Sequence, residues 1–161
     1  MPTSCRTVIQ GGRAKAYRPM PAAARRKAFE AGLAAYANDD FFLAHELLEP
    51  PWMGARKLPE RELIQGVIKL AAAFVHGART NPSGIEKNLR GARDRLAGAG
   101  AAGERLEVDV QALLEAIDVR LLEPPRVQDP AIEIPRLGGA PRVAPGADPP
   151  PAKNQRVLGR A

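Results

Sequence analysis

Cysteine, aromatic side chains and long apolar runs are scarce in this chain of 161 residues. The single cysteine, Cys5, excludes an internal disulfide and is typical of a reducing compartment, so we expect a cytoplasmic protein. No apolar run approaches the roughly 20 residues of a membrane-spanning helix, and none follows the basic N-terminal residues as in a secretory signal. Because aromatic residues make up only 4%, the core is expected to consist of Leu, Ile, Val and Ala, which suits packed helices.

The net charge of +6 is distributed unevenly along the chain. Residues 1–19 carry a net charge of +4 and residues 124–161 carry +3, whereas the segment 20–123 carries −1. Loose basic segments bind phosphates weakly and without sequence preference. Weak, nonspecific nucleic-acid binding through the two tails is therefore kept as an alternative function, and no membrane partner is expected.

Proline, glycine and apolar periodicity divide the chain into three parts. Residues 1–19 show no apolar period and are predicted to be a disordered basic head. Residues 20–123 carry apolar residues at helical spacing and are predicted to form a single small helical bundle. Nine of the sixteen prolines lie from Pro124 onward, so residues 124–161 are predicted to be a Pro- and Arg-rich disordered tail. No segment shows convincing period-2 alternation, and the predicted fold class is all-α.

About five helices are predicted in the bundle. They cover about residues 21–37, 40–49, 59–76, 82–97 and 109–123, with capping side chains expected at Asp40, Asn81 and Asp109. The third has a broad apolar face and is predicted to be the central helix. Pro50 and Pro51 are expected to end or kink the second helix, which leaves residues 52–58 as a loop.

The chemically richest stretch is residues 41–52, which read FFLAHELLEPPW. At 100° per residue, His45 and Glu49 share a face with large apolar residues, while Glu46 lies at the border of that face. A lone buried carboxylate is costly, so it must be paired, neutralised or bound to a cation. We expect this face to look toward the central helix, where Gln65 and His76 lie on one edge and at most one of them meets His45.

Three interpretations of this cluster stay open. In the first, His45 and Glu49 form a structural pair one helical turn apart, bonded to Gln65, and fix how the second and third helices meet. In the second, they bind a divalent metal such as zinc, manganese or iron, although the zincin and di-iron motifs are both incomplete. In the third, His45, Glu46 and Glu49 perform acid/base chemistry. Trp52 is interpreted as an anchor of the core or of an interface.

The same residues carry a family resemblance. A His-Glu-x-x-Glu-x-x-Trp run followed by a Gln-Gly start to an apolar helix resembles the uncharacterised family called domain of unknown function 309. The residues of this pattern are Phe42, His45, Glu46, Glu49, Trp52, Gln65, Gly66 and His76. The resemblance covers roughly residues 25–120 and implies a small all-helical bundle from bacteria or archaea, without implying a reaction. Pro50-Pro51 departs from the pattern, because a typical member continues its helix to the tryptophan.

The leading hypothesis is a cytoplasmic helical binding or interaction module that self-associates, rather than an enzyme. The sequence has no glycine-rich phosphate loop, no cysteines at metal-binding spacing and no nucleophile elbow, so no cofactor is predicted and a divalent metal stays an alternative. The rival hypothesis is a hydrolase that works through His45, Glu46 and Glu49, with or without a metal.

Overall fold

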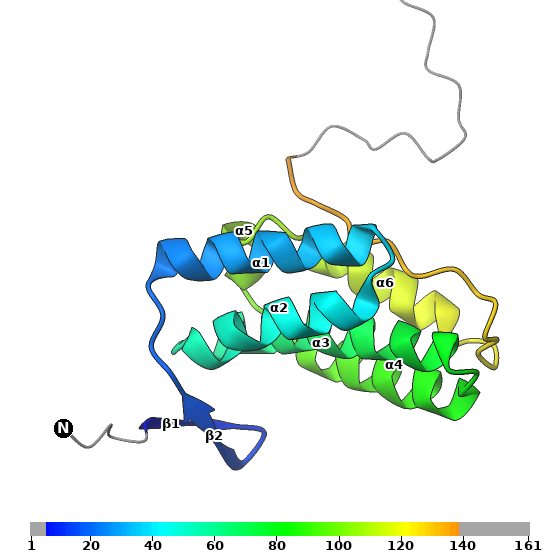
Figure 1. Ribbon diagram of the computed structural model, residues 1–161, viewed down its shortest axis with the longest axis horizontal. Coiled ribbons are helices and arrows are strands. Elements are labelled where there is room, and N and C mark those ends of the chain that lie inside the picture. Colours follow the sequence, from blue (N-terminus) through cyan, green and yellow to red (C-terminus); the bar gives the residue numbers. More distant parts are fainter. Residues whose placement is uncertain (1–5, 139–161) are drawn as a thin grey trace, which may run out of the picture.

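Six helices and one small hairpin make up residues 6–138, the part of the chain that the computed structural model describes. The hairpin consists of β1 (Arg6–Gln10) and β2 (Arg13–Tyr17). The helices are α1 (Ala22–Ala37), α2 (Phe41–Gly54), α3 (Leu58–Ala78), α4 (Pro82–Ala97), α5 (Ala102–Arg105) and α6 (Val110–Arg120). Figure 1 shows the hairpin at one end of the bundle, beneath the neighbouring ends of α2 and α3. The predicted all-α fold class is confirmed, with the short α5 as one helix more than expected.

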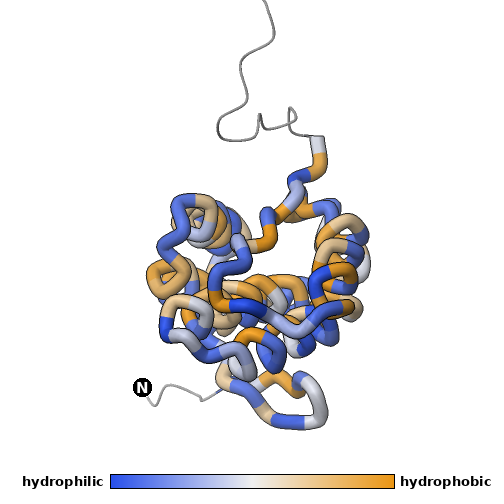
Figure 2. The backbone as a smooth tube through the Cα atoms, turned by 90° about the vertical axis from the view of Figure 1, so that its right-hand side faces the viewer, coloured by the Kyte–Doolittle hydropathy of each residue, from blue (hydrophilic) through white to orange (hydrophobic). Residues whose placement is uncertain are grey.

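The longest helix, α3, is the centre of the bundle, as its apolar pattern predicts. It packs against both α2 and α4, and α1 packs on the side of α2 that faces away from α3. Leu63, Ile64, Val67 and Leu70 of α3 are fully buried, and Phe29 of α1 is buried with them. Figure 2 views the helices nearly end-on, and their coils carry orange apolar segments as well as blue polar ones. The core is therefore mainly aliphatic.

Two glycines allow neighbouring helices to approach closely. A Cβ atom added to Gly66 of α3 would lie 2.6 Å from Cγ of Leu96 in α4, well inside van der Waals contact. A Cβ atom added to Gly32 of α1 would lie 2.5 Å from Cγ of Leu48 in α2. Gly66, which belongs to the family pattern, thus serves the packing of α3 against α4.

The second helix does not end at Glu49, contrary to the prediction. It continues through Pro50 and Pro51 to Gly54, so Trp52 is helical and not part of a loop. Each proline removes one intrahelical donor, and tertiary hydrogen bonds hold the end of α2. The guanidinium of Arg61 in α3 donates to the carbonyl oxygens of Trp52 at 3.1 Å and Ala55 at 3.0 Å. The prolines therefore leave Trp52 on the helix.

The prediction of a disordered head is wrong for residues 6–17. Gly11 and Gly12 have φ values of 59° and 74°, as the two central residues of a tight type I′ hairpin turn require. Gln10 and Arg13 pair across this turn, and the Gln10 side chain is buried against the helices. The Gly-Gly pair between two five-residue runs was the available hairpin signal. Cys5 and the rest of residues 1–5 lie outside the described residues.

The prediction of a disordered tail is wrong for residues 124–138. This segment runs over the bundle, with Ile132 and Ile134 buried two residues apart in the manner of an extended chain. The hydroxyl of Tyr36 donates to the carbonyl of Ile132 at 2.6 Å, and Arg136 forms a salt bridge with Glu30. Ile132 and Ile134 on either side of the polar Glu133 were a short period-2 signal. Residues 139–161 lie outside the described residues.

No helix within residues 6–138 has the length and apolar character that crossing a bilayer requires. The expected cytoplasmic location and self-association stay predictions.

Candidate functional site

A pocket of about 240 Å³ lies between α2, α3 and α4. Its lining consists of His45, Glu49, Trp52, Gln65, Ile68, Lys69, Ala72 and Asn88. His45 and Glu49 are one turn apart on α2, and Gln65 and Lys69 are one turn apart on α3, so each helix contributes a pair of polar side chains. His45 and Glu49 thus face α3 near Gln65, which is the geometry that the helical periodicity predicts.

Four residues of the family pattern lie outside this pocket. Phe42 is 61% exposed, and Glu46 is exposed on the outer side of α2. Nδ1 of His76 lies 3.1 Å from Nδ2 of Asn81, at the far end of α3, and Gly66 faces α4. Glu46 therefore does not share a pocket with His45 and Glu49.

A polar network adjoins the pocket and attaches the hairpin to the helices. The buried side chain of Gln10 donates from Nε2 to Oε1 of Gln65 at 2.6 Å and to Oε1 of Glu62 at 2.8 Å. Its Oε1 accepts from Nε1 of Trp52 at 3.1 Å. Glu62 also forms a salt bridge of 3.2 Å with Arg95 of α4. One hairpin side chain therefore contacts two pocket residues, Trp52 and Gln65.

Arg61 is the largest fully buried residue of the network. Besides its bonds to the last turn of α2, its guanidinium carbon lies 5.3 Å from the ring centroid of Trp52, within cation–π range. Burial lowers the pKa of Arg61, and the neighbouring Glu62 opposes that effect. Arg61 holds the Trp52 ring from the side of α3.

The structural pair of His45 and Glu49 bonded to Gln65, the first of the three interpretations, is not seen among the hydrogen bonds of the described residues. Among residues 6–138, no side-chain hydrogen bond or ion pair joins His45 to Glu49 or to Gln65. The partner of Gln65 is instead Gln10, which lies in the segment predicted to be disordered. His45 and Glu49 thus line the pocket without a side-chain hydrogen bond between them.

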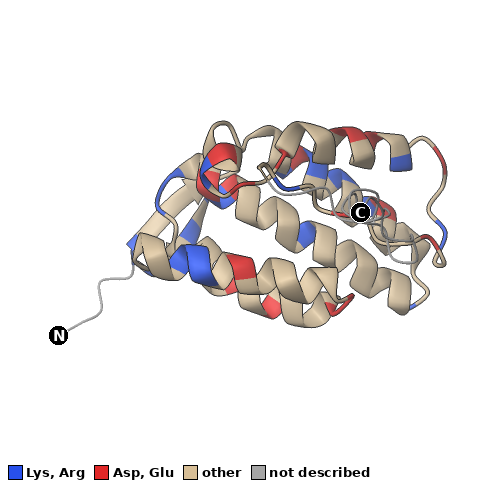
Figure 3. Ribbon diagram, turned by 90° about the horizontal axis from the view of Figure 1, so that it is seen from above, with Lys and Arg blue, Asp and Glu red and all other residues tan. Residues whose placement is uncertain are grey.

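Lys69 was missed by the sequence interpretation, although it follows Gln65 by one turn on the same face. Burial lowers the pKa of its ammonium group, and repulsion from Arg95, Lys87 and Lys15 lowers that pKa further. Within residues 6–138 Lys69 has no carboxylate within salt-bridge distance. Figure 3 shows several basic segments at the end of the bundle where the N-terminus lies. Lys69 therefore places a positive group in the pocket wall, and within residues 6–138 it forms no salt bridge with Glu49, the one carboxylate among the lining residues.

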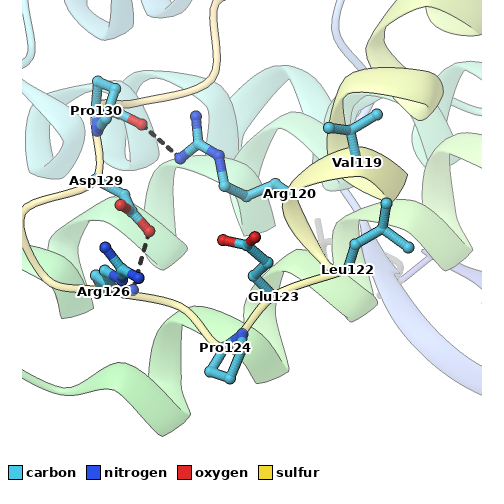
Figure 4. Close-up of a pocket in the computed structure, with 8 residues that line it drawn as sticks. All are labelled: Val119, Arg120, Leu122, Glu123, Pro124, Arg126, Asp129 and Pro130. Atoms are coloured by element: carbon cyan, nitrogen blue, oxygen red, sulfur yellow. Dashed lines mark hydrogen bonds between the residues drawn. The ribbon is translucent and has the colours of Figure 1, made fainter.

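A second pocket of about 410 Å³ lies between the end of α6 and the chain that follows it (Figure 4). The Arg120 side chain reaches across it and donates to the carbonyl of Pro130 at 2.6 Å, and Asp129 accepts from the backbone nitrogen of Arg126 at 2.9 Å. These polar groups serve the local loop, so this pocket is the weaker candidate site.

A metal centre would need several ligating side chains in one place. Within residues 6–138 no three His, Cys, Asp or Glu side chains come together in that way. His45 and Glu49 alone supply two ligands, fewer than the coordination preferred by the metals considered.

Replacing Gln10 with alanine is expected to lower the free energy of unfolding by about 1–3 kcal/mol, because Glu62, Gln65 and the Trp52 nitrogen each lose a buried partner. Urea unfolding followed by the fluorescence of the single tryptophan measures both the stability and the surroundings of Trp52. Thr7→Ala, on an exposed position of the same strand, is the matched control. Equal stability of the two variants would contradict a docked hairpin.

The pocket coincides with a recognised family segment. Residues 29–88 match the model of the family described as Domain of unknown function (DUF309). This confirms the resemblance expected from the sequence, over a shorter range, and all eight pocket-lining residues lie within the matched segment. The Gln10 hairpin and Arg95 lie outside it. No curated protein and no solved structure matches the chain.

Proposed function

We propose that this domain, whose pocket lies in the segment matching DUF309, is a binding module for a small anion such as a carboxylate or a phosphate. The observation that carries the proposal is Lys69, a half-buried cation on the pocket wall with no acidic partner among residues 6–138. A cation in that position raises the local concentration of anions and orients them.

The charges around Lys69 favour an anion over a neutral ligand. Lys15 from β2 and Lys87 and Arg95 from α4 all act on Lys69 as like charges. Glu62 is paired with Arg95 and also acts on Arg61. A unit negative charge about 4 Å from a cation is attracted by about 4 kcal/mol at an effective dielectric constant near 20. An anionic group beside Lys69 would therefore offset the repulsion from Lys15, Lys87 and Arg95.

The volume of the pocket and the residues on its α2 side restrict which ligands can bind. A volume of about 240 Å³ is below the range of roughly 300–1,000 Å³ that is usual for drug-sized ligands, so a molecule of few heavy atoms is expected. Glu49 lines the α2 side, where it can accept a hydrogen bond from a ligand hydroxyl or amine. Ile68 and Ala72 provide an apolar wall between the polar groups.

A hydrolase remains the second candidate because His45 and Glu49 line the same pocket without being bonded to each other. Glu46, the third residue of that hypothesis, is exposed and does not line the pocket. Self-association and weak nucleic-acid binding stay predictions that do not depend on the pocket.

The binding function predicts a charge-dependent stabilisation. Glycolate and inorganic phosphate, each compared with sodium chloride at equal ionic strength, are expected to raise the melting temperature of the wild-type chain. A ligand at about 100 times its dissociation constant stabilises by about 2.7 kcal/mol. Lys69→Met should abolish the rise, because methionine retains an apolar stem without the charge. Lys27→Met, on the exposed side of α1, is the control and should keep it. No rise in the wild type with either anion, or an equal rise in all three proteins, would refute the proposal.

A further inference from the structure

Lys69 differs from an ordinary surface lysine in how its side chain is held. Lys27 and Lys57 are exposed, whereas Lys69 is half-buried in the pocket wall. Its stem lies against α4 at Gly91, where an added Cβ atom would be 2.9 Å from Cδ of Lys69. The absence of a side chain at Gly91 thus leaves room for the Lys69 stem against α4, which restrains it beside the pocket.

The neutral form of the Lys69 amine is more favoured in the pocket wall than it is for a lysine in water. Burial and the three neighbouring cations, Lys15, Lys87 and Arg95, all lower its pKa. Desolvation and adjacent positive charge are the two ways in which proteins make a lysine amine nucleophilic. The titratable groups that line the pocket from α2 are His45 and Glu49. A lysine amine, an imidazole and a carboxylate therefore line the same small pocket.

We propose that the bound anion carries an aldehyde or ketone group and that Lys69 captures it reversibly as an imine, an inference that rests on the binding function proposed above. A 2-oxo acid is the chemical class that combines the required anion with a carbonyl in few heavy atoms. Its carbonyl carbon meets the Lys69 amine inside the pocket, and its carboxylate is attracted by the positive charges of Lys15, Lys87 and Arg95, which act on Lys69 from outside the pocket lining.

The step needs neither an oxidant nor a reductant. The lone pair on Nζ of neutral Lys69 forms a bond to the carbonyl carbon, the π electrons move to the oxygen, and one proton passes from nitrogen to oxygen. The nitrogen lone pair of this carbinolamine then expels the hydroxyl group, which takes up a proton and leaves as water. His45 lines the pocket from α2, and it supplies that proton and recovers it when water reverses the reaction.

Reductive trapping tests the inference with glyoxylate, the smallest 2-oxo acid, as the probe. Cyanoborohydride converts an imine into a stable secondary amine, and peptide mass spectrometry of the full chain gives a labelling rate for each lysine. Lys69 is expected to be labelled several-fold faster than the exposed Lys27 and Lys57. His45→Gln should slow labelling at Lys69 alone, and an unchanged rate would remove His45 from the proton transfer. Labelling of Lys69 no faster than that of Lys27 would overturn the imine proposal.

Glycolate separates this inference from the binding function, because it carries the carboxylate without the carbonyl. Lys69→Arg retains the positive charge but cannot form an imine, so it should keep the glycolate-dependent rise in melting temperature and lose labelling at position 69. A rise with glycolate in the wild type, without preferential labelling of Lys69, overturns the imine and leaves the binding function standing. No rise with either glycolate or phosphate overturns the binding function, and the imine with it.

Discussion

Replacing Arg61 with leucine is expected to lower the free energy of unfolding by about 3–5 kcal/mol, because several buried groups lose their partner at once. Arg61 is 0% exposed. Its guanidinium donates to the carbonyl oxygen of Trp52, which also accepts from the backbone nitrogen of Ala55, and to the carbonyl oxygen of Ala55 just past the end of α2. A cation there also interacts favourably with the negative end of the helix dipole. Leucine fills part of the volume and satisfies none of these oxygens.

Urea unfolding of the variant, compared with Arg90→Gln, measures this effect. Arg90 pairs with Glu86 one turn away on the exposed side of α4, and such surface pairs contribute about 0.5 kcal/mol or less. Arg61→Lys should fall between the wild type and the leucine variant, since lysine retains the charge but not the planar fork of donors. A loss in Arg61→Leu no larger than that in Arg90→Gln would show that Arg61 does not cap α2.

A chain that ends at residue 123 is expected to be less stable than one that ends at residue 138 by about 4–6 kcal/mol. The shorter chain loses the buried side chains of Ile132 and Ile134, each contributing about 1.5–3 kcal/mol. It also leaves the hydroxyl of Tyr36 without the carbonyl of Ile132 as its acceptor. Because small domains are stable by only about 5–15 kcal/mol, much of this domain's stability depends on the segment 124–138.

The two truncated chains are compared by urea denaturation and by near-ultraviolet circular dichroism. Ile132→Ala in the full chain should reproduce part of the loss, and Glu133→Ala, at the exposed position beside it, should not. Equal midpoints of unfolding for the two truncated chains would contradict a structural role for residues 124–138.

Local signals predicted the helices well because the residues that start them act over one turn. The side chains of Asp40, Asn81 and Asp109 each accept from a backbone nitrogen three residues later, as expected of helix caps. The central position of α3 followed from its apolar face. Helical geometry also oriented His45 and Glu49 correctly, because their spacing places them on one side of α2.

The segments that were mispredicted depend on contacts between residues far apart in the sequence. Gln10 bonds to Gln65, 55 positions away, and Tyr36 bonds to Ile132, 96 positions away. Neither partner can be identified from its own surroundings in the sequence. Lys69 was overlooked for a related reason, since a lysine on a long helix is ordinarily solvated. Burial in the pocket wall and the cations contributed by β2 and α4 make it unusual.

The side-chain amide of Gln10 couples the docking of the hairpin to ligand binding in the pocket, two processes that would otherwise be independent. It forms hydrogen bonds with the side chains of Trp52 and Gln65, and these two side chains also line the pocket. A molecule that favours one arrangement of those two side chains must shift the docking equilibrium of the hairpin, and a docked hairpin must shift the affinity of the pocket by the same factor. Ligand binding in the pocket would therefore change the docking of β1 and β2, although both strands lie outside the segment that matches the family.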